Sequence, residues 1–253
     1  MLRWWLSQPV VAFSKPVSHR ASQCGQNALS MSEHVKLEAS DGHELDAYVA
    51  HPEGGPIAGL VVVQELFGVN RHIRSVADGY AKEGFLTVAP ALFDRYERGL
   101  ELGYEGEDMQ KAMSLISRLN LDHALKDTAA ALEYARRQTG KKSGVIGYCF
   151  GGTIAWLAAA RLDVNAAVGY YGGQIAKFAD EHPQAPTMLH FGKLDQHIPK
   201  ESIDAVEAAN PKVPVFWYHA GHGFNCNDRA SYNAEAARLA KERSLEFLKK
   251  HLV

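Results

Sequence analysis

Short apolar runs rich in β-branched residues alternate with helix-like segments along most of this chain, and this alternation restricts the fold more than any other feature. Residues 59–64 and 85–90 are almost entirely apolar, which is typical of strands buried on both faces. Between them, residues 70–83 place Ile73, Val76 and other apolar side chains at helical intervals, and a glycine follows as a stop signal. The pattern predicts an α/β fold with a mostly parallel central sheet covered by helices on both faces.

The other elements are predicted in the same way. An antiparallel hairpin is expected over residues 36–49 around the turn Asp41-Gly42, and residues 91–107 are polar and irregular, as in a loop over a site. The remaining predicted strands are 144–147, 166–171, 187–191 and 213–218. The remaining predicted helices are 108–118, 122–138, 151–161, 201–209 and 231–250.

The chain is long enough for one sizeable core, with 253 residues of which 46% are hydrophobic. We expect a single domain over residues 32–253 and a disordered N-terminal extension over residues 1–31. The extension carries Arg3, Lys15 and Arg20 and no acidic residue, so a targeting segment is the alternative, as is a misassigned start.

Charge and cysteine content exclude several classes of protein. The formal net charge of −2 gives no basic surface for nucleic acid or an anionic membrane, and no apolar run is long enough to span a bilayer. Three cysteines, Cys24, Cys149 and Cys226, are too few for a disulfide scaffold. The few cysteines favour a reducing compartment such as the cytoplasm. We also expect a monomer whose partner is a small molecule and neither a nucleic acid nor a membrane.

Cys149 is the first candidate for chemistry. It lies in Gly147-Tyr-Cys-Phe-Gly-Gly152, between a predicted strand and a predicted helix, which is the thiol version of the nucleophile elbow. The glycines relieve crowding on the tight turn, and the helix N-terminus favours a thiolate. A buried cysteine is often only a small apolar residue, so this motif needs support from elsewhere in the chain.

Asp195 and His222 supply that support. Each follows its own predicted strand, and the carboxyl ends of parallel strands meet at one edge of a sheet. The chain order of nucleophile, acid and histidine is that of the α/β-hydrolase fold. An isolated Asp or His in a loop has an ordinary structural explanation, but three in this order predict a catalytic triad. In this template, the backbone N–H of Phe150 forms half of the oxyanion hole.

Four motifs together resemble the dienelactone hydrolase (carboxymethylenebutenolidase) family. They are Gln64-Glu-Leu-Phe-Gly-Val-Asn70, the elbow around Cys149, Gly192-Lys-Leu-Asp195 and Gly221-His-Gly-Phe224. The resemblance extends from residue 35 to the C-terminus. It implies lactone or ester hydrolysis by a triad of Cys149, His222 and Asp195, without a cofactor.

The resemblance also implies roles for residues outside the triad. Glu65 is implied as an additional carboxylate that holds and activates the thiol, and Leu66 as the second oxyanion-hole amide. Arg95 matches the first of two arginines that bind the substrate's carboxylate in this family. Cys226 stands where the second arginine is expected, with Arg229 nearby, and a missing bidentate arginine leaves the lactone substrate open.

Two other functions stay open at this point. One is a carboxylesterase or thioesterase that acts on substrates without a carboxylate. The other is a non-catalytic binding module that kept the fold. No metal site is predicted, because His219 and His222 lack an acidic or cysteine partner at a ligand spacing, and the Gly54-Gly55 pair precedes its strand and so forms no phosphate loop.

Overall fold

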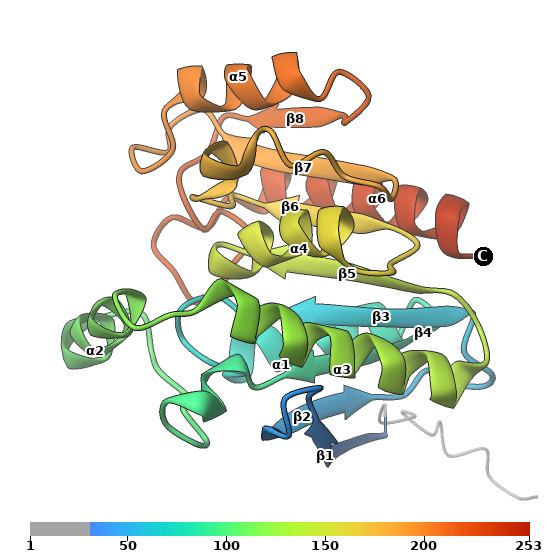
Figure 1. Ribbon diagram of the computed structural model, residues 1–253. Helices are drawn as coiled ribbons and strands as arrows, with labels where there is room; N and C mark the ends of the chain where they lie inside the picture. Colours follow the sequence, from blue (N-terminus) through green and yellow to red (C-terminus); the bar gives the residue numbers. More distant parts are fainter. Residues whose placement is uncertain (1–30) are drawn as a thin grey trace, which may run out of the picture.

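An eight-stranded sheet forms the centre of the computed structural model, which describes residues 31–253 (Figure 1). Almost all of the predicted N-terminal extension, residues 1–30, therefore lies outside the described residues. The strand order is β1-β2-β4-β3-β5-β6-β7-β8. The strands are β1 (Ser32–Glu38), β2 (Glu44–Ala50), β3 (Ala58–Val63), β4 (Phe85–Pro90), β5 (Ser143–Tyr148), β6 (Ala167–Tyr170), β7 (Thr187–Gly192) and β8 (Val215–Tyr218).

The sheet is parallel except at one edge. The predicted hairpin is confirmed, since β1 pairs antiparallel with β2, and β2 pairs antiparallel with β4. All remaining pairs are parallel. Because β3 lies between β4 and β5, the direction in which strands are added reverses beside β3. Ligands of such sheets bind at this switch point, beyond the carboxyl ends of the strands.

Helices cover both faces, as the alternating pattern predicts. Helices α3 and α4 lie on one face, and α1 and α6 lie on the other (Figure 1). This arrangement is the α/β-hydrolase fold. The helices are α1 (Arg71–Ala81), α2 (Gly106–Ile116), α3 (Leu121–Thr139), α4 (Phe150–Arg161), α5 (Lys200–Ala209) and α6 (Ala234–Leu252), with short 3-10 turns η1 (Leu92–Arg95) and η2 (Ile175–Phe178).

Three predicted boundaries shift for local reasons. The expected loop 91–107 contains η1 and the first residues of α2. Strand β8 begins at Val215 because Pro214 has no N–H to donate to a ladder. Helix α6 begins at Ala234, after the side chain of Asn233 caps it by accepting from the N–H of Ala236.

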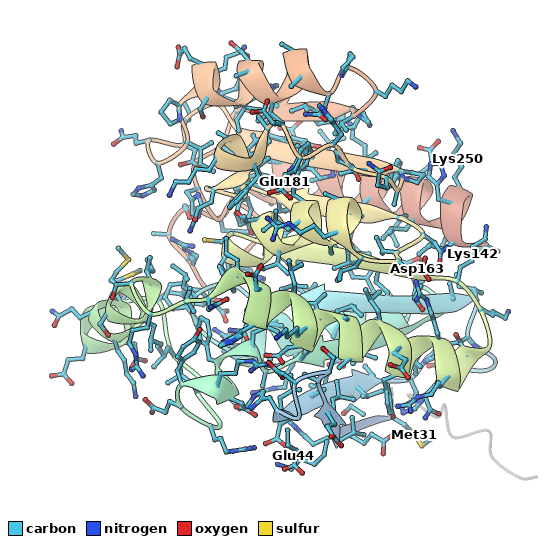
Figure 2. The ribbon with its side chains drawn as sticks, viewed as in Figure 1. Met31, Glu44, Lys142, Asp163, Glu181 and Lys250 are labelled. Carbon is cyan, nitrogen blue, oxygen red and sulfur yellow. The ribbon has the colours of Figure 1, made fainter. Side chains whose placement is uncertain are left out.

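The surface carries the charged side chains, and the sheet carries the apolar ones. Lys142 and Lys250 project to solvent (Figure 2), whereas every residue of β3, β4 and β5 is buried. Among the helices of the described part, none combines the length and apolarity needed to cross a membrane.

A close backbone contact joins the end of β3 to the turn after β5. The N–H of Gly151 donates to the carbonyl of Gln64 at 3.1 Å. A Cβ on Gly151 would lie 2.4 Å from the carbonyl oxygen of Val63 and 2.6 Å from that of Gln64. Only glycine allows this approach, so the sequence Cys-Phe-Gly-Gly sets how near the two loops lie to each other.

Gly151→Ala should lower the free energy of unfolding by about 3 kcal/mol, because the added methyl must displace backbone. The measurement is urea unfolding followed by circular dichroism. Gly55→Ala is the matched control, since a Cβ there meets nothing within 4 Å, and its effect should stay within about 0.5 kcal/mol. Equal effects of the two variants would contradict the close contact.

Candidate active site

Cys149 occupies a strained turn between β5 and α4. Its φ is 53° and its ψ is −113°, a backbone conformation that costs a non-glycine residue on the order of 1–3 kcal/mol. The turn is held from outside, because the N–H of Cys149 donates to the carbonyl of Tyr170 at 3.0 Å. Such strain concentrates at functional sites, and here it falls on the predicted nucleophile.

The structure brings the three predicted triad residues together. Cys149 Sγ lies 3.2 Å from His222 Nε2, and His222 Nδ1 lies 2.7 Å from Asp195 Oδ2. The other carboxylate oxygen, Oδ1, accepts from the N–H of His197 at 2.8 Å, which fixes the orientation of Asp195. The thiol, imidazole and carboxylate therefore form a continuous hydrogen-bonded chain.

The surroundings of His222 favour its protonated form. Burial by itself lowers the pKa of this imidazole, but the hydrogen bonds to Asp195 and Cys149 outweigh burial and raise the pKa to about 10. An imidazolium beside the sulfur stabilises a thiolate. The arrangement can therefore hold a charged nucleophile and a proton donor in contact.

Glu65 is completely buried directly after β3. Its Oε2 accepts from the hydroxyl of Tyr104 at 3.1 Å, whereas its Oε1 has no hydrogen-bond partner among the described residues. The guanidinium of Arg229 is 3.7 Å from Oε1. A buried carboxylate oxygen without a hydrogen-bond donor is costly, so this oxygen is available to another partner.

Two residues that line the cavity carry backbone amides without a hydrogen bond among the described residues. The N–H groups of Leu66 and Phe150 donate to no acceptor among the described residues, and both residues line the cavity beside Cys149. The contact between Gly151 and Gln64 holds their two loops together. Two free amides near a nucleophile are the requirement for stabilising an oxyanion.

A cavity of about 320 Å³ opens beside the thiol. Its polar lining includes His222, His197 and Arg229. The guanidinium of Arg229 lies over the rings of Phe67 and Tyr104 at 5.8 and 5.6 Å. The apolar wall is formed by Leu66, Phe67, Met109, Met113, Ile116 and Leu119. The cavity can hold a small apolar molecule with one anionic group.

Comparison with known proteins identifies the family of the chain. The model of the dienelactone hydrolase family matches residues 45–252. The chain belongs to the dienelactone hydrolase family. Membership identifies it as a hydrolase of the carboxylic-ester and lactone class, as the sequence predicted.

Named relatives cover most of the chain. A carboxymethylenebutenolidase of Pseudomonas putida is 35% identical over 227 residues, which are 86% of this chain and 96% of the relative. A putative carboxymethylenebutenolidase of Synechocystis is 36% identical over 213 residues, covering 77% and 87% of the two chains. The crystal structure of a putative dienelactone hydrolase from Klebsiella pneumoniae aligns with a TM-score of 0.75, at 28% identity over 86% of this chain and 98% of that one.

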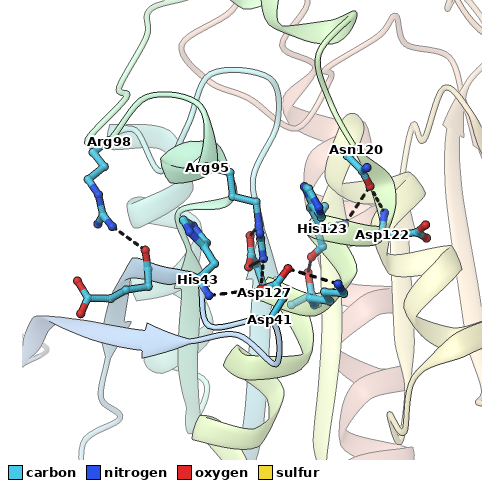
Figure 3. Close-up of polar contacts among 12 residues, drawn as sticks. Asp41, His43, Arg95, Arg98, Asn120, Asp122, His123 and Asp127 are labelled. Carbon is cyan, nitrogen blue, oxygen red and sulfur yellow. Dashed lines mark hydrogen bonds and ion pairs between the residues drawn. The ribbon is translucent and has the colours of Figure 1, made fainter.

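Arg95, the arginine expected to anchor a carboxylate in this family, is not among the residues that line the cavity. Its guanidinium makes two hydrogen bonds to Asp127, of 2.8 and 2.7 Å, and one of 3.0 Å to Asp41 (Figure 3). Asp127 is completely buried, so Arg95 neutralises a charge inside the protein. The structure therefore gives Arg95 a stabilising position, and the binding role expected from the resemblance stays without geometric support.

Sequence reasoning did not assign roles to three polar residues around Glu65. Tyr104 lies within the irregular segment 91–107 and has no motif of its own, and His72 lies in the first turn of α1 between Arg71 and Ile73. Burial is the main cause that lowers the pKa of His72 and raises that of Cys226 to about 11. Glu65, His72 and Cys226 together offer three ligand atoms within 4.8 Å of one another. Only the folded chain reveals this proximity.

Titration of His222 tests the triad electrostatics. The raised pKa means that its pairing stabilises the fold fully below about pH 6.5, and that this contribution is lost as the pH rises through about 10. Histidine-labelled NMR should show His222 deprotonating near pH 10, and Asp195→Asn should shift the midpoint several units lower. Asp204→Asn, on α5, is the control and should leave the midpoint unchanged. An ordinary midpoint in the unmodified protein would contradict the pairing.

Proposed function

We propose that this protein hydrolyses small carboxylic esters or lactones through nucleophilic attack by Cys149. The observation that carries the proposal is the chain of contacts from Cys149 Sγ to His222 Nε2 at 3.2 Å and from His222 Nδ1 to Asp195 at 2.7 Å. Nucleophile, base and orienting acid in this relation are the requirement for covalent acyl transfer. The cavity beside the sulfur provides the place for an acyl group.

The reaction proceeds in two halves. The thiolate of Cys149 attacks the carbonyl carbon, and the carbonyl oxygen becomes an oxyanion that the amides of Leu66 and Phe150 stabilise. The imidazolium of His222 then gives its proton to the departing alkoxide, leaving a thioester. A water molecule next loses a proton to His222 and attacks the thioester, and collapse releases the carboxylic acid and restores the thiolate–imidazolium pair.

Glu65 completes the proposed site. Its position directly before Leu66, in the loop that follows β3 (the oxyanion loop, residues 64–70), and its free Oε1 support a role beside the thiol, as the family resemblance implies. Burial raises the pKa of Tyr171, and both Glu65 and Cys149 contribute to the increase, so the two groups lie within electrostatic reach of one ring. Every step uses groups of this chain, and we propose no cofactor.

The cavity suggests the class of substrate. An apolar wall with a single guanidinium supports an acyl or lactone group that carries a carboxylate, with Arg229 as the anchor in place of the family's arginine at position 226. The apolar wall also supports neutral esters as the alternative. The free thiols of Cys149 and Cys226 support a reducing compartment such as the cytoplasm, and a monomer stays a prediction.

Cys149→Ala should reduce kcat/KM for aryl acetates and for a dienelactone by at least about a thousandfold, because no other group can form the thioester. Steady-state hydrolysis assays measure this loss, and a thermal melt verifies that the variant is folded. Cys24→Ala is the matched control and should keep full activity. Unchanged turnover in Cys149→Ala would contradict the proposal.

Labelling with iodoacetamide separates a hydrolase from a binding module that kept the fold. Cys149 should react faster than Cys24 and Cys226, because its sulfur lies beside the imidazolium of His222, which stabilises the reactive thiolate. Mass spectrometry of timed samples gives the three rates. Equal rates would favour the binding module.

Arg229→Gln tests the proposed anchor. The ratio of kcat/KM for a carboxylate-bearing dienelactone to that for a neutral aryl acetate should fall about 10- to 100-fold, the usual effect of a lost charge-assisted hydrogen bond. Arg95→Gln is the contrasting variant. It should leave this ratio unchanged and lower the free energy of unfolding by about 3 kcal/mol, because Asp127 stays buried without its partner. If the ratio fell in Arg95→Gln and stayed unchanged in Arg229→Gln, the carboxylate anchor would be Arg95 and not Arg229.

A further inference from the structure

Three side chains from distant parts of the chain meet in the interior of the protein. Glu65 follows β3, His72 lies in the first turn of α1, and Cys226 lies in the segment between β8 and α6. One carboxylate oxygen, one ring nitrogen and the sulfur lie within 4.8 Å of one another, and all three residues are buried. The catalytic mechanism uses neither His72 nor Cys226.

Two buried polar atoms in this cluster make no hydrogen bond within the described part of the chain. Glu65 Oε1 and His72 Nε2 are both buried and make no hydrogen bond among the described residues. Each such atom costs on the order of 1–3 kcal/mol in the folded state, and the great majority of buried polar atoms avoid this cost. Two of them in one three-residue cluster indicate a site whose partner is a ligand of another kind.

We propose that Glu65, His72 and Cys226 bind a thiophilic divalent cation, with Zn²⁺ as the cation that best fits the three donors. Carboxylate oxygen, imidazole nitrogen and thiolate sulfur are the ligands that Zn²⁺ prefers. Binding releases the thiol proton of Cys226 to solvent. The carboxylate and the thiolate then balance the two charges of the cation, so the buried site is neutral as a whole.

The geometry requires a small contraction. Bonds of about 2.0 to 2.3 Å place neighbouring ligand atoms of a tetrahedron about 3.5 Å apart. The present spacing of up to 4.8 Å therefore closes by about 1 Å, within the range of side-chain rotation. A water molecule takes the fourth position.

Neighbouring groups orient the ligand atoms and affect how a cation reaches them. Tyr104 donates to Glu65 Oε2, which leaves Oε1 as the free oxygen. Arg229, 3.7 Å from Oε1, opposes a second cation, but its guanidinium is held over the rings of Phe67 and Tyr104 on the side of the catalytic cavity. His72 also lines a separate cavity of about 380 Å³, which gives the cation a route that avoids the catalytic thiol.

A cation bound at this site should change the activity of the proposed enzyme. The cation takes the carboxylate oxygen that makes no hydrogen bond to the described residues, on the side chain that the proposed function assigns to activation of the thiol, so Zn²⁺ should suppress hydrolysis reversibly. This consequence rests on the proposed function, whereas binding of the cation does not. Binding of the cation and inhibition of hydrolysis are therefore measured in separate experiments.

Cobalt is the spectroscopic probe for binding. Titration of the full chain with Co²⁺ should produce a thiolate-to-metal absorption band with one cation bound per chain. Cys149→Ser should keep the band, whereas Cys226→Ser should abolish it and His72→Gln should weaken the affinity at least about tenfold. His197→Gln, which removes an imidazole beside the catalytic thiol, is the matched control and should keep the affinity. A band lost in Cys149→Ser and kept in Cys226→Ser, or no binding at all, would overturn the proposal.

A ligand exchange distinguishes coordination from a structural effect. His72→Cys replaces nitrogen by sulfur and should retain Zn²⁺ binding by calorimetry, while His72→Ala should lose it, with thermal melts verifying that both fold. If the two variants lose binding equally, His72 is not a ligand.

Inhibition is tested last. Zn²⁺ should inhibit the unmodified enzyme, a chelator should restore activity, and Cys226→Ser should resist inhibition at least about tenfold in Zn²⁺ concentration. Equal inhibition of Cys226→Ser would place the inhibitory cation at the catalytic pair and overturn this part. The cobalt band stands independently of whether Cys149 proves to be the nucleophile.

Discussion

The hydrogen bond from Gly151 to the carbonyl of Gln64 is the contact on which the site depends. It joins two loops that follow neighbouring parallel strands, and the glycine permits an approach that any Cβ would block. One loop carries Cys149, the proposed nucleophile, and the amide of Phe150, and the other carries Glu65 and the amide of Leu66. The relative position of all four groups therefore follows from one backbone contact, without help from flexible side chains.

This arrangement explains why the fold was predictable from the sequence. The buried β-branched strands, the helical periods and the order of Cys149, Asp195 and His222 are local signals, and each falls where the parallel sheet requires it. The triad residues all follow strands, so predicting the strands also predicts the edge at which they meet. The strand start at Val215 depends on the missing N–H of Pro214, and the helix start at Ala234 depends on the side-chain cap of Asn233.

The surroundings of the triad were less predictable, because they depend on contacts between residues far apart in the chain. Arg95 follows the right strand for an anchor, but the buried carboxylate of Asp127 lies within its reach and holds it. No periodicity reveals that a carboxylate on α3 is buried beside η1. In the same way, His72 and Cys226 carry no ligand spacing in the sequence, and only the packing of α1 against the segment after β8 places them beside Glu65.

Helix α2 lies apart from the layers of the sheet and its covering helices (Figure 1), and it supplies Met109, Met113 and Ile116 to the cavity. Unbranched thioether side chains rotate readily and fill irregular spaces. The part of the cavity wall that α2 supplies is thus deformable, while the part formed by the elbow and by the loop after β3 is held by backbone hydrogen bonds. In the proposed reaction, the part held by backbone contacts would fix the position of the carbonyl, and the deformable wall would accept alcohol groups of different widths, so selectivity for the reacting bond and breadth for the rest of the molecule would reside in different elements.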